Sequence, residues 1–337
     1  MRKSFWHNKK VLITGIDGFV GSNLAKKLLS LKANIYGVVQ KKNKKSLLYF
    51  EKLDNKCKLF KVDLTNQKFI SKILKNNFEI IFHLAAQVEV GVANKGPYKT
   101  WESNIRGTYT ILDSLIGNKK IKSIILASSD KSYGTYPKSL LPYKETYSSR
   151  AVYPYDVSKA CADMIGQTYA SELFKLPIIT TRFSNIYGPG QLHFSALIPD
   201  IMKSIILNKK FIPRGDGSDL RDYVYINDII DLYLLLASNL YKKPKLRGEI
   251  FNAGINKPIT VKNVVKKFYL IRNKNKELAK ILQLMKSKKN KGEIPFQYMD
   301  YKKLNKYFGW KPKYKFEETI EKVFEWYEKY FHKNNII

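Results

Sequence analysis

The stretch that decides the fold is Gly15-Ile16-Asp17-Gly18-Phe19-Val20-Gly21, which follows a β-rich run over 11–14 and opens an apolar-periodic helix over 19–31. Glycines at its first two positions permit a tight turn and a close approach of the backbone to a pyrophosphate. The third glycine lets the helix pack closely on the strand, and the helix N-terminus faces the anion. The spacing is G-x-x-G-x-x-G, and its place between a strand and a helix predicts a dinucleotide site.

Outward from this turn, β-rich runs alternate with helical periods through the first half of the chain. The expected strands are residues 11–14, 34–39, 58–62, 80–84, 123–128 and 177–182. The expected helices are residues 19–31, 67–75, 98–115 and 156–174. This alternation predicts an α/β fold of the Rossmann type, a doubly wound parallel sheet.

The pattern changes after Tyr187-Gly188-Pro189-Gly190. Helices are expected near 195–207, 227–238, 260–269 and 316–330, with short strands at 223–225 and 250–252. This irregular order predicts a smaller α+β lobe, with the lysine-rich stretch 272–292 as its most mobile segment. We therefore expect a dinucleotide-binding domain, residues 1–186, and a C-terminal substrate lobe, residues 187–337, interleaved with the first domain around 222–254.

The composition of the 337 residues excludes several classes of protein. Apolar residues make up 44% of the chain and aromatic residues 13%, which is enough for a buried core and excludes a disordered chain. No run approaches the roughly 20 apolar residues that a membrane-spanning helix needs, and no secretory signal is visible at the first residues, so we expect a cytoplasmic protein without a membrane partner. Two cysteines, Cys57 and Cys161, are too few for a disulfide framework or a zinc site, and we expect no metal.

The formal charge of +33 comes from 61 basic and 28 acidic side chains. Only eight of the basic residues are arginines, whose bidentate fork is the usual reader of bases and phosphates. The 53 lysines are spread along the whole chain, which favours a solvated lysine-rich surface over a nucleic-acid face. Such a surface would still attract an anionic small substrate.

The choice between NAD and NADP depends on the residues after the second and third strands. A carboxylate about 20 positions after the glycine turn usually holds the adenosine ribose, but the second strand ends Gly37-Val38-Val39-Gln40-Lys41-Lys42. Asp63, in Val62-Asp63-Leu64, could contact the adenine instead. NAD is the expected cofactor, and NADP stays open because a lysine here could receive a 2′-phosphate.

A second motif, Tyr155-Asp156-Val157-Ser158-Lys159, lies on an expected helix. One helical turn places Tyr155 and Lys159 on the same face. A lysine ammonium beside a phenol favours the phenolate, so we expect Lys159 to lower the pKa of Tyr155 from its usual value of about 10. The pair then predicts a base that acts near neutral pH.

With both motifs in place, the chain resembles the extended short-chain dehydrogenase/reductase superfamily, in its NAD-dependent epimerase/dehydratase family. The resemblance runs from about residue 9 to 254. Besides the two motifs, it rests on His83-Leu84-Ala85-Ala86-Gln87, Asn104-Ile105-Arg106-Gly107-Thr108, Arg182-Phe183-Ser184-Asn185-Ile186-Tyr187-Gly188-Pro189-Gly190 and Arg221-Asp222-Tyr223-Val224-Tyr225-Ile226-Asn227-Asp228.

The stretch Ser128-Ser129-Asp130-Lys131-Ser132-Tyr133-Gly134 separates the branches of that superfamily. The 4-epimerases usually place small or apolar residues where Asp130 and Lys131 stand, whereas sugar-nucleotide 4,6-dehydratases place an acid–base pair there. The Ser-Asp-Lys variant is similar to that of the CDP-glucose 4,6-dehydratase-like enzymes. The resemblance therefore implies a sugar-nucleotide 4,6-dehydratase, with a 4-epimerase as the alternative. A more distant alternative is a non-catalytic NAD(P)-binding protein with a basic nucleic-acid-binding surface.

The implied reaction converts an NDP-hexose, of CDP-glucose or GDP-mannose type, to the 4-keto-6-deoxy product. It proceeds by oxidation at C4, loss of water across C5 and C6, and return of the hydride. The resemblance implies Tyr155 as the base at O4 with Lys159 beside it, Ser129 as a hydrogen-bond partner of O4, and Asp130 as the acid for the C6 hydroxyl. Lys131 either takes the C5 proton, if desolvation leaves it neutral, or stabilises the enolate while another group moves the proton.

The same resemblance implies the binding residues and the assembly. The implied cofactor-binding residues are Gly15, Asp17, Gly18, Phe19, Val20, Gly21, Gln40, Asp63, Leu64, Leu84, Ala85, Ala86, Gln87, Asn104, Tyr155 and Lys159. The implied ligands of the nucleotide-sugar substrate are Gln87, Ser129, Asn185, Leu197, Arg214 and Arg221. Helices 98–115 and 156–174 are where the superfamily forms a dimer, so a homodimer is expected.

Overall fold

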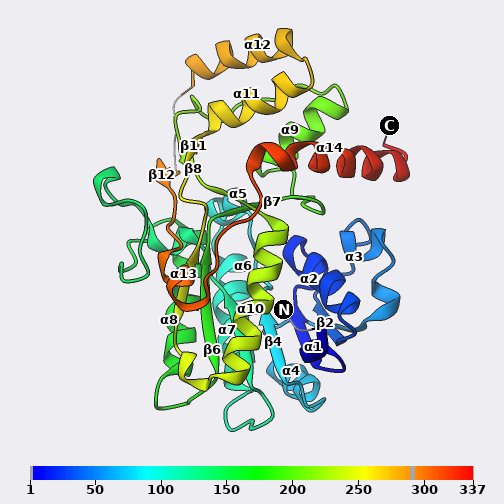
Figure 1. Cartoon of the computed structure of the whole chain (residues 1–337), viewed down its shortest axis with the longest axis vertical. Helices are drawn as coiled ribbons and strands as arrows, with labels where there is room; N and C mark the ends of the chain where they lie inside the picture. Colours follow the sequence, from blue (N-terminus) through cyan, green and yellow to red (C-terminus); the bar gives the residue numbers. More distant parts are fainter. Residues whose placement is uncertain (1–2, 289–292, 337) are drawn as a thin grey trace. The chain divides into compact units, whose positions relative to one another are not determined.

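The computed structural model describes residues 3–288 and 293–336, which form two compact units (Figure 1). The first unit comprises the residues up to Gly134, Glu145–Arg182 and Ile229–Asn252. The second comprises Thr135–Lys144, Phe183–Asp228 and the residues from Ala253 onward. Compared with the division expected after residue 186, the first unit gains 229–252 and the second gains 135–144 and 183–186.

The first unit is built on a seven-stranded sheet of order β10-β6-β5-β4-β1-β2-β3. Its strands are β1 (Lys10–Thr14), β2 (Asn34–Val39), β3 (Lys58–Lys61), β4 (Ile80–His83), β5 (Ser123–Ala127), β6 (Ile178–Phe183) and β10 (Ile250–Ala253). The pairs from β6 to β3 are parallel. The strand order reverses between β1 and β4, and ligands of such sheets bind where this reversal occurs. The Rossmann-type fold prediction is confirmed.

Helices connect these strands and cover the sheet. They are α1 (Lys3–Trp6), α2 (Phe19–Ser30), α3 (Leu47–Phe50), α4 (Gln67–Leu74), α5 (Val90–Lys95), α6 (Tyr98–Trp101), α7 (Gly107–Asp113), α8 (Pro154–Ala170) and α10 (Ile226–Lys242). The single helix expected over 98–115 is α6 and α7 joined by a π-helical segment, Glu102–Arg106.

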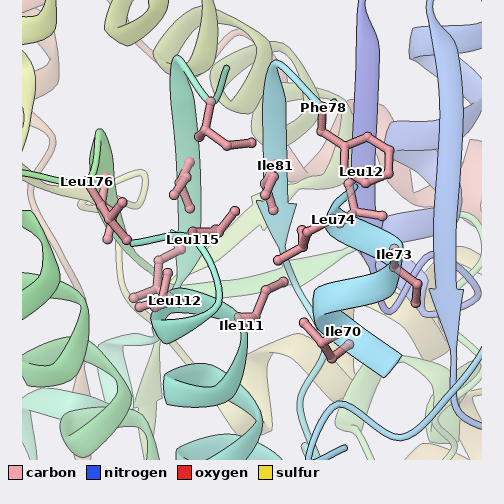
Figure 2. Close-up of a cluster of buried hydrophobic side chains, with 14 of the residues drawn as sticks. Leu12, Ile70, Ile73, Leu74, Phe78, Ile81, Ile111, Leu112, Leu115 and Leu176 are labelled. Carbon is pink, nitrogen blue, oxygen red and sulfur yellow. The ribbon is translucent and has the colours of Figure 1, made fainter. Parts of the chain in front are cut away.

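One face of the sheet carries the main apolar core, shown in Figure 2. Ile70 and Ile73 of α4 and Leu112 of α7 pack there on strand residues such as Leu12 and Ile81. The next residue on β4, Phe82, points to the other face, where its ring contacts Trp6 of α1 and Tyr233 of α10. Alternate residues of β4 are therefore buried on both faces, as the continuous apolar run of a parallel strand requires.

The second unit contains two small sheets and five α-helices among the residues described. β8 (Leu220–Arg221) lies between β11 (Ile259–Thr260) and β12 (Phe296–Gln297), and β7 (Asn185–Tyr187) pairs with β9 (Tyr223–Tyr225). The helices are α9 (Leu197–Ile206), α11 (Val261–Ile271), α12 (Asn275–Lys286), α13 (Lys302–Phe308) and α14 (Phe316–Lys333). Aromatic rings form its core, with Phe316 in contact with Tyr187, Tyr223 and Phe268.

Helix α12 occupies most of the lysine-rich stretch 272–292, for which no helix was expected. It buries Leu278, Ile281 and Met285, which recur at helical spacing among the lysines. Residues 289–292 of the stretch lie outside the described residues.

Candidate active site

The turn that follows β5 carries three of the predicted catalytic residues. β5 ends at Ala127, and a short 3-10 turn, Asp130–Tyr133, begins three residues later. The Ser129 hydroxyl caps this turn, because its Oγ accepts a hydrogen bond from the Lys131 amide at 3.2 Å. The same hydroxyl donates to Oδ1 of the buried Asp130 at 2.9 Å. The structure thus brings Ser129 and Asp130 together.

Helix α8 presents Tyr155 and Lys159 one turn apart, and both side chains are buried. The helix starts at Pro154, a residue that favours the first helical position because it lacks the amide hydrogen. The Lys159 ammonium donates a hydrogen bond to the Ala127 carbonyl, with 2.6 Å between Nζ and O, so this side chain joins α8 to the end of β5. Burial lowers the pKa of Lys159 to about 8, although the carboxylate of Asp163 raises it.

The pKa of Tyr155 corrects one prediction. Burial raises this pKa above its usual value, the negative charges of Asp130 and Asp156 raise it further, and only a hydrogen bond with Ser129 lowers it. Lys159, whose ammonium donates to the Ala127 carbonyl, is not among the groups that change this pKa. The described residues therefore hold Tyr155 as a neutral phenol, not as the phenolate that the Tyr-x-x-x-Lys spacing predicted.

Asn104 connects the segment after β4 to helix α8. Its Oδ1 accepts from the Gln87 amide at 2.7 Å, and its Nδ2 donates to the Gln87 carbonyl at 3.0 Å and to Ser158 Oγ at 2.9 Å. Asn104 lies in the π-helical segment Glu102–Arg106, and such segments occur frequently at functional sites. In this structure Asn104 positions Gln87, and its predicted contact with a cofactor stays a prediction.

The glycine turn is closely packed at the switch point of the sheet. Gly15 has a φ of 68°, and a Cβ there would lie 2.8 Å from Cα of Ala85. A Cβ at Gly21 would lie 2.2 Å from the Gly15 carbonyl oxygen. The Thr14 hydroxyl accepts from the amides of Leu84 and Ala85 at 3.1 and 3.2 Å, so the loop after β4 is fixed beside the turn. Glycines at 15 and 21 are required by these contacts.

The residues present fit a dinucleotide. Gly18 is the N-cap of the 12-residue helix α2, where no side chain caps the amides and the first turn, which starts with Phe19 and Val20, has no acidic residue. Those amides can therefore donate to a pyrophosphate. Asp17 in the turn has its pKa raised by burial. Gly18, Phe19, Val20 and Ala86 stay predicted cofactor contacts.

The two candidates for the adenosine end are in direct contact. Gln40, which follows β2, donates to Oδ2 of Asp63 at 2.7 Å. The Thr65 amide and hydroxyl donate to Oδ1 of Asp63, and these bonds, the amide bond above all, hold the pKa of Asp63 below its usual value. Leu64 packs beside Gly107 of α7. A carboxylate is thus fixed next to the end of β2 although no acidic residue stands on that strand.

His83 lies under this region and is held in the neutral form. Burial, with a smaller contribution from the charge of Lys159, lowers its pKa to about 3. Its Nδ1 lies 2.8 Å from the Thr14 hydroxyl and its Nε2 lies 3.1 Å from the Thr108 hydroxyl. Both ring nitrogens have partners, so His83 supports the end of β4 and does not act as an acid or base.

The substrate-binding candidates of the second unit have different surroundings. Arg221 is buried on β8, and its Nη1 donates to the carbonyls of Leu220 and Pro295 at 3.0 and 3.4 Å. Its Nη2 lies 3.5 Å from an Asp219 oxygen and 3.4 Å from a Glu293 oxygen, and these partners were not predicted. Asn185 pairs through its backbone with β9 and donates from Nδ2 to the Asp222 carbonyl at 3.4 Å. Leu197 starts α9, and Arg214 is exposed.

The whole chain can now be compared with known proteins. A family model described as GDP-mannose 4,6 dehydratase matches residues 12–323. The chain belongs to this family. Its fold, its glycine turn and its Ser-Asp-Lys turn are therefore those of a member of the GDP-mannose 4,6-dehydratase family, which confirms the resemblance inferred from the motifs.

Curated relatives of this family member are sugar-nucleotide dehydratases. The dTDP-D-glucose 4,6-dehydratase of Homo sapiens is 29% identical over 332 residues, which cover 96% of this chain and 91% of the relative. The CDP-glucose 4,6-dehydratase of Salmonella typhimurium is 26% identical over 338 residues, which cover 97% of this chain and 92% of the relative.

Solved structures similar to this family member include a dehydratase and an epimerase. The dTDP-glucose 4,6-dehydratase of Bacillus anthracis, in complex with NAD, has a TM-score of 0.80 at 26% identity and covers 95% of this chain and 97% of its own. The UDP-glucose 4-epimerase of Thermotoga maritima, with UDP-glucose, has a TM-score of 0.79 at 25% identity and covers 95% and 99%.

Within residues 3–288 and 293–336, no helix is long and apolar enough to cross a membrane. Over the same described residues, no group of three or more His, Cys, Asp or Glu side chains could hold a metal ion.

Sequence reasoning missed the buried partners of the catalytic residues. Asp156 is buried beside Tyr155, and Asp163 forms an ion pair with Arg182. Arg182 could have been found from its residue type, since arginine is scarce in this lysine-rich chain. Asp163 could have been found from its position one helical turn after Lys159.

Proposed function

We propose that this protein is an NAD-dependent sugar-nucleotide 4,6-dehydratase that converts an NDP-hexose to an NDP-4-keto-6-deoxyhexose. The observation that carries the proposal is the buried carboxyl of Asp130, hydrogen-bonded to Ser129 and close enough to Tyr155 to raise the pKa of the phenol. A 4-epimerase has no need of an acid at this place, because its reaction releases no water.

The residues take the following roles in this proposal. Tyr155 receives the O4 proton, while Ser129 hydrogen-bonds O4 and the phenol. Bound NAD would accept the hydride from C4 and later supply it to C6. Asp130, in its protonated form, gives its proton to the C6 hydroxyl as this leaves as water. Lys131 takes the C5 proton as a neutral amine, or it stabilises the enolate as a cation while another group takes that proton. Lys159, with a pKa of about 8, keeps its positive charge at neutral pH and so favours ionisation of Tyr155 once a ligand displaces it from Ala127.

The cofactor site favours NAD over NADP. The Asp63 carboxylate lies beside Gln40 at the end of β2, where it can hold adenosine and would repel a 2′-phosphate. Lys42, one of the two lysines that could have received that phosphate, lies over the Tyr49 ring with its Nζ 4.8 Å from the centroid. The nucleotide released from denatured protein should therefore be NAD, and release of NADP would contradict this choice.

The substrate proposed is a nucleotide sugar whose diphosphate binds Arg221. A guanidinium suits a diphosphate because two N–H groups can meet two oxygens. Arg221 is already oriented by two backbone carbonyls, and a diphosphate would exchange with the Asp219 and Glu293 carboxylates on its Nη2. Gln87, Asn185, Leu197 and Arg214 complete the proposed set of substrate ligands.

Incubation with CDP-glucose, dTDP-glucose, UDP-glucose and GDP-mannose, followed by mass analysis, tests the function. We expect one of these to lose the mass of one water without added oxidant or reductant, because the hydride is returned. A product of unchanged mass with inverted C4 would identify a 4-epimerase, which the similarity to the Thermotoga maritima structure makes the second candidate. No turnover of any sugar nucleotide would contradict both.

The proposed assembly is a homodimer formed through α6, α7 and α8. Large apolar side chains are exposed on these helices, namely Tyr98 (73%), Trp101 (41%), Tyr109 (41%) and Met164 (58%). We expect sedimentation to give a dimer at micromolar concentration and a monomer for Met164→Glu, because a charge in an apolar interface is costly. Phe69→Glu, at an exposed residue of α4, is the control and should stay dimeric. A monomeric wild-type protein would contradict the proposal.

A further inference from the structure

Tyr133, at the end of the turn that carries Asp130 and Lys131, has several hydrogen-bond partners. Tyr133 is the last residue of the turn Asp130–Tyr133 and is fully buried. Its hydroxyl donates to Oδ1 of Asn252 on β10 at 2.7 Å, and the amide of Asn252 in turn donates to Oε1 of Glu145 at 2.9 Å. The carbonyl of Tyr133 accepts from the Arg150 amide at 2.8 Å.

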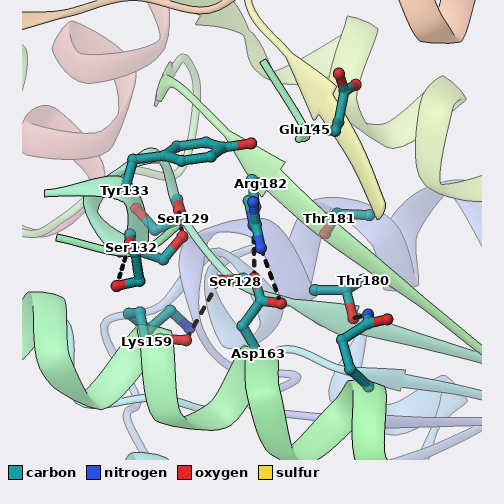
Figure 3. A network of polar contacts seen from close by, with 12 residues as sticks. Ser128, Ser129, Ser132, Tyr133, Glu145, Lys159, Asp163, Thr180, Thr181 and Arg182 are labelled. Atoms are coloured by element: carbon teal, nitrogen blue, oxygen red, sulfur yellow. Dashed lines mark hydrogen bonds and ion pairs between the residues drawn. The ribbon is translucent and has the colours of Figure 1, made fainter. Parts of the chain in front are cut away.

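The ring of Tyr133 is held by an ion pair that reaches helix α8. The guanidinium carbon of Arg182, on β6, lies 4.6 Å from the centroid of this ring. Arg182 donates from Nε to Oδ2 of Asp163 at 2.7 Å and from Nη2 to Oδ1 at 3.3 Å, a two-pronged contact shown in Figure 3. Asp163 lies on α8 one turn after Lys159 and two turns after Tyr155. A chain of contacts therefore runs from the turn to the helix.

We propose that Asp163, Arg182 and Tyr133 are positioning residues, which hold the turn with Ser129, Asp130 and Lys131 against the helix with Tyr155 and Lys159. The proposal rests on the function proposed above and adds residues to it that touch neither substrate nor cofactor. The two halves of the reaction depend on the turn to different extents. C4 oxidation uses Tyr155 and Lys159 of the helix with only a hydrogen bond from Ser129, whereas loss of water also needs the acid Asp130 on the turn. Loss of water is therefore the step that depends most on the distance between the turn and the helix.

The surroundings of the Arg182–Asp163 ion pair indicate that it fixes the geometry of the site more than it stabilises the fold. The side chains of Arg182 and Asp163 are only 12% and 4% exposed, and burying two charges costs about as much as their attraction returns. What such a pair supplies is a fixed geometry, because the planar guanidinium fork meets a carboxylate in one orientation and also stacks on a ring. The chain uses one of its eight arginines here, where lysine would supply charge without that geometry.

Amide hydrogen exchange measures the positioning directly and needs no substrate. Arg182→Lys keeps a positive charge beside Asp163, but it removes the two-bond guanidinium–carboxylate contact and the packing of the guanidinium on the Tyr133 ring. We expect the amides of residues 131–134 to exchange about tenfold faster in this variant, and those of β5 to be unchanged. Tyr133→Phe keeps the ring but removes the hydroxyl with its hydrogen bonds to Asn252 and Arg182, and it should raise their exchange about fivefold.

A second tyrosine cluster of the first unit supplies the matched control. Tyr241 donates to Oε2 of Glu79 at 2.8 Å, and Lys9 lies over its ring with Nζ 4.7 Å from the centroid. Glu79 and Lys9 form an ion pair at 2.7 Å, so carboxylate, cation and tyrosine are combined as at Tyr133. Tyr241→Phe should leave both the exchange of residues 131–134 and the turnover as in the wild type.

Kinetics separate positioning from a general loss of structure. In Arg182→Lys we expect the rate of water loss to fall about 100-fold with KM changed less than about twofold, because a displacement near 1 Å costs that much at a reacting centre. C4 oxidation should fall far less, so that reduced cofactor accumulates after substrate is added. Equal loss of both steps in proportion to unfolded protein would overturn the proposal, as would wild-type exchange of residues 131–134 in Arg182→Lys. If the wild type itself loses no water from any sugar nucleotide, the proposed function fails, and the exchange comparison still decides the positioning.

Discussion

Replacing Tyr155 by Phe is expected to abolish both hydride transfer and loss of water. The variant keeps the buried ring on α8 but has no oxygen to receive the O4 proton, and oxidation at C4 cannot start without that transfer. Loss of a general base costs about 100- to 10,000-fold in rate. Single-turnover absorbance should show no reduced cofactor after substrate is added, and product analysis should show no change in mass.

Tyr169→Phe is the matched control for this variant. Tyr169 lies on the same helix, and its hydroxyl donates to Asp113 at 3.2 Å on an exposed surface. We expect wild-type turnover from this control and a melting temperature unchanged within about 2 °C, since surface hydroxyls contribute little. Appearance of reduced cofactor in Tyr155→Phe at the wild-type rate would assign the O4 proton to another residue.

Asp130→Asn should stop the reaction after its first step. Asparagine keeps the size and the hydrogen-bonding shape of the side chain but has no proton to give to the C6 oxygen. C4 oxidation should survive while loss of water slows by about 100- to 10,000-fold, as for loss of a general acid. The protein would then accumulate with reduced cofactor, visible in the absorbance band of reduced nicotinamide.

Two further variants define the role of Asp130. Asp156→Asn removes the other carboxylate that raises the pKa of Tyr155, so it shares the electrostatic effect but removes no acid. We expect no reduced cofactor to accumulate in it. Lys131→Met should resemble Asp130→Asn if Lys131 moves the C5 proton or stabilises the enolate. If Asp130→Asn turned over at the wild-type rate, the Ser-Asp-Lys stretch would have no catalytic role. The basis of the dehydratase proposal would then be gone.

The sequence predicted the elements that are set by local pattern. The expected strand over 34–39 coincides with β2, and the glycine turn opens α2 where its spacing placed the helix. Gln40 and Asp63 were both expected among the cofactor-binding residues, and the structure shows that they follow adjacent parallel strands and are hydrogen-bonded. Residues that follow neighbouring parallel strands can meet in this way because the carboxyl ends of such strands lie at one edge of the sheet.

Features that depend on contacts between distant residues were not predicted. The bond from Tyr133 to Asn252 joins residues 119 positions apart, and the contact of Arg221 with Glu293 joins residues 72 apart. The raised pKa of Tyr155 has the same origin, because burial and the Asp130 charge come from the folded environment and not from the Tyr-x-x-x-Lys spacing. The π-helical segment with Asn104 is also invisible in the sequence, since its periodicity differs from that of an α-helix over only a few residues.

The position of β10 in the sheet has a consequence for synthesis on the ribosome. This strand, Ile250–Ala253, occupies the outer place beside β6, whereas the other six strands end by residue 183. While the chain is growing, β6 is therefore an open edge with unpaired backbone groups until residue 253 has left the exit tunnel. Open edges of apolar strands template association between chains. A nascent chain that stalls between residues 183 and 250 thus exposes β6 as an unpaired edge that can pair with other chains. Such a chain is a natural substrate for chaperones.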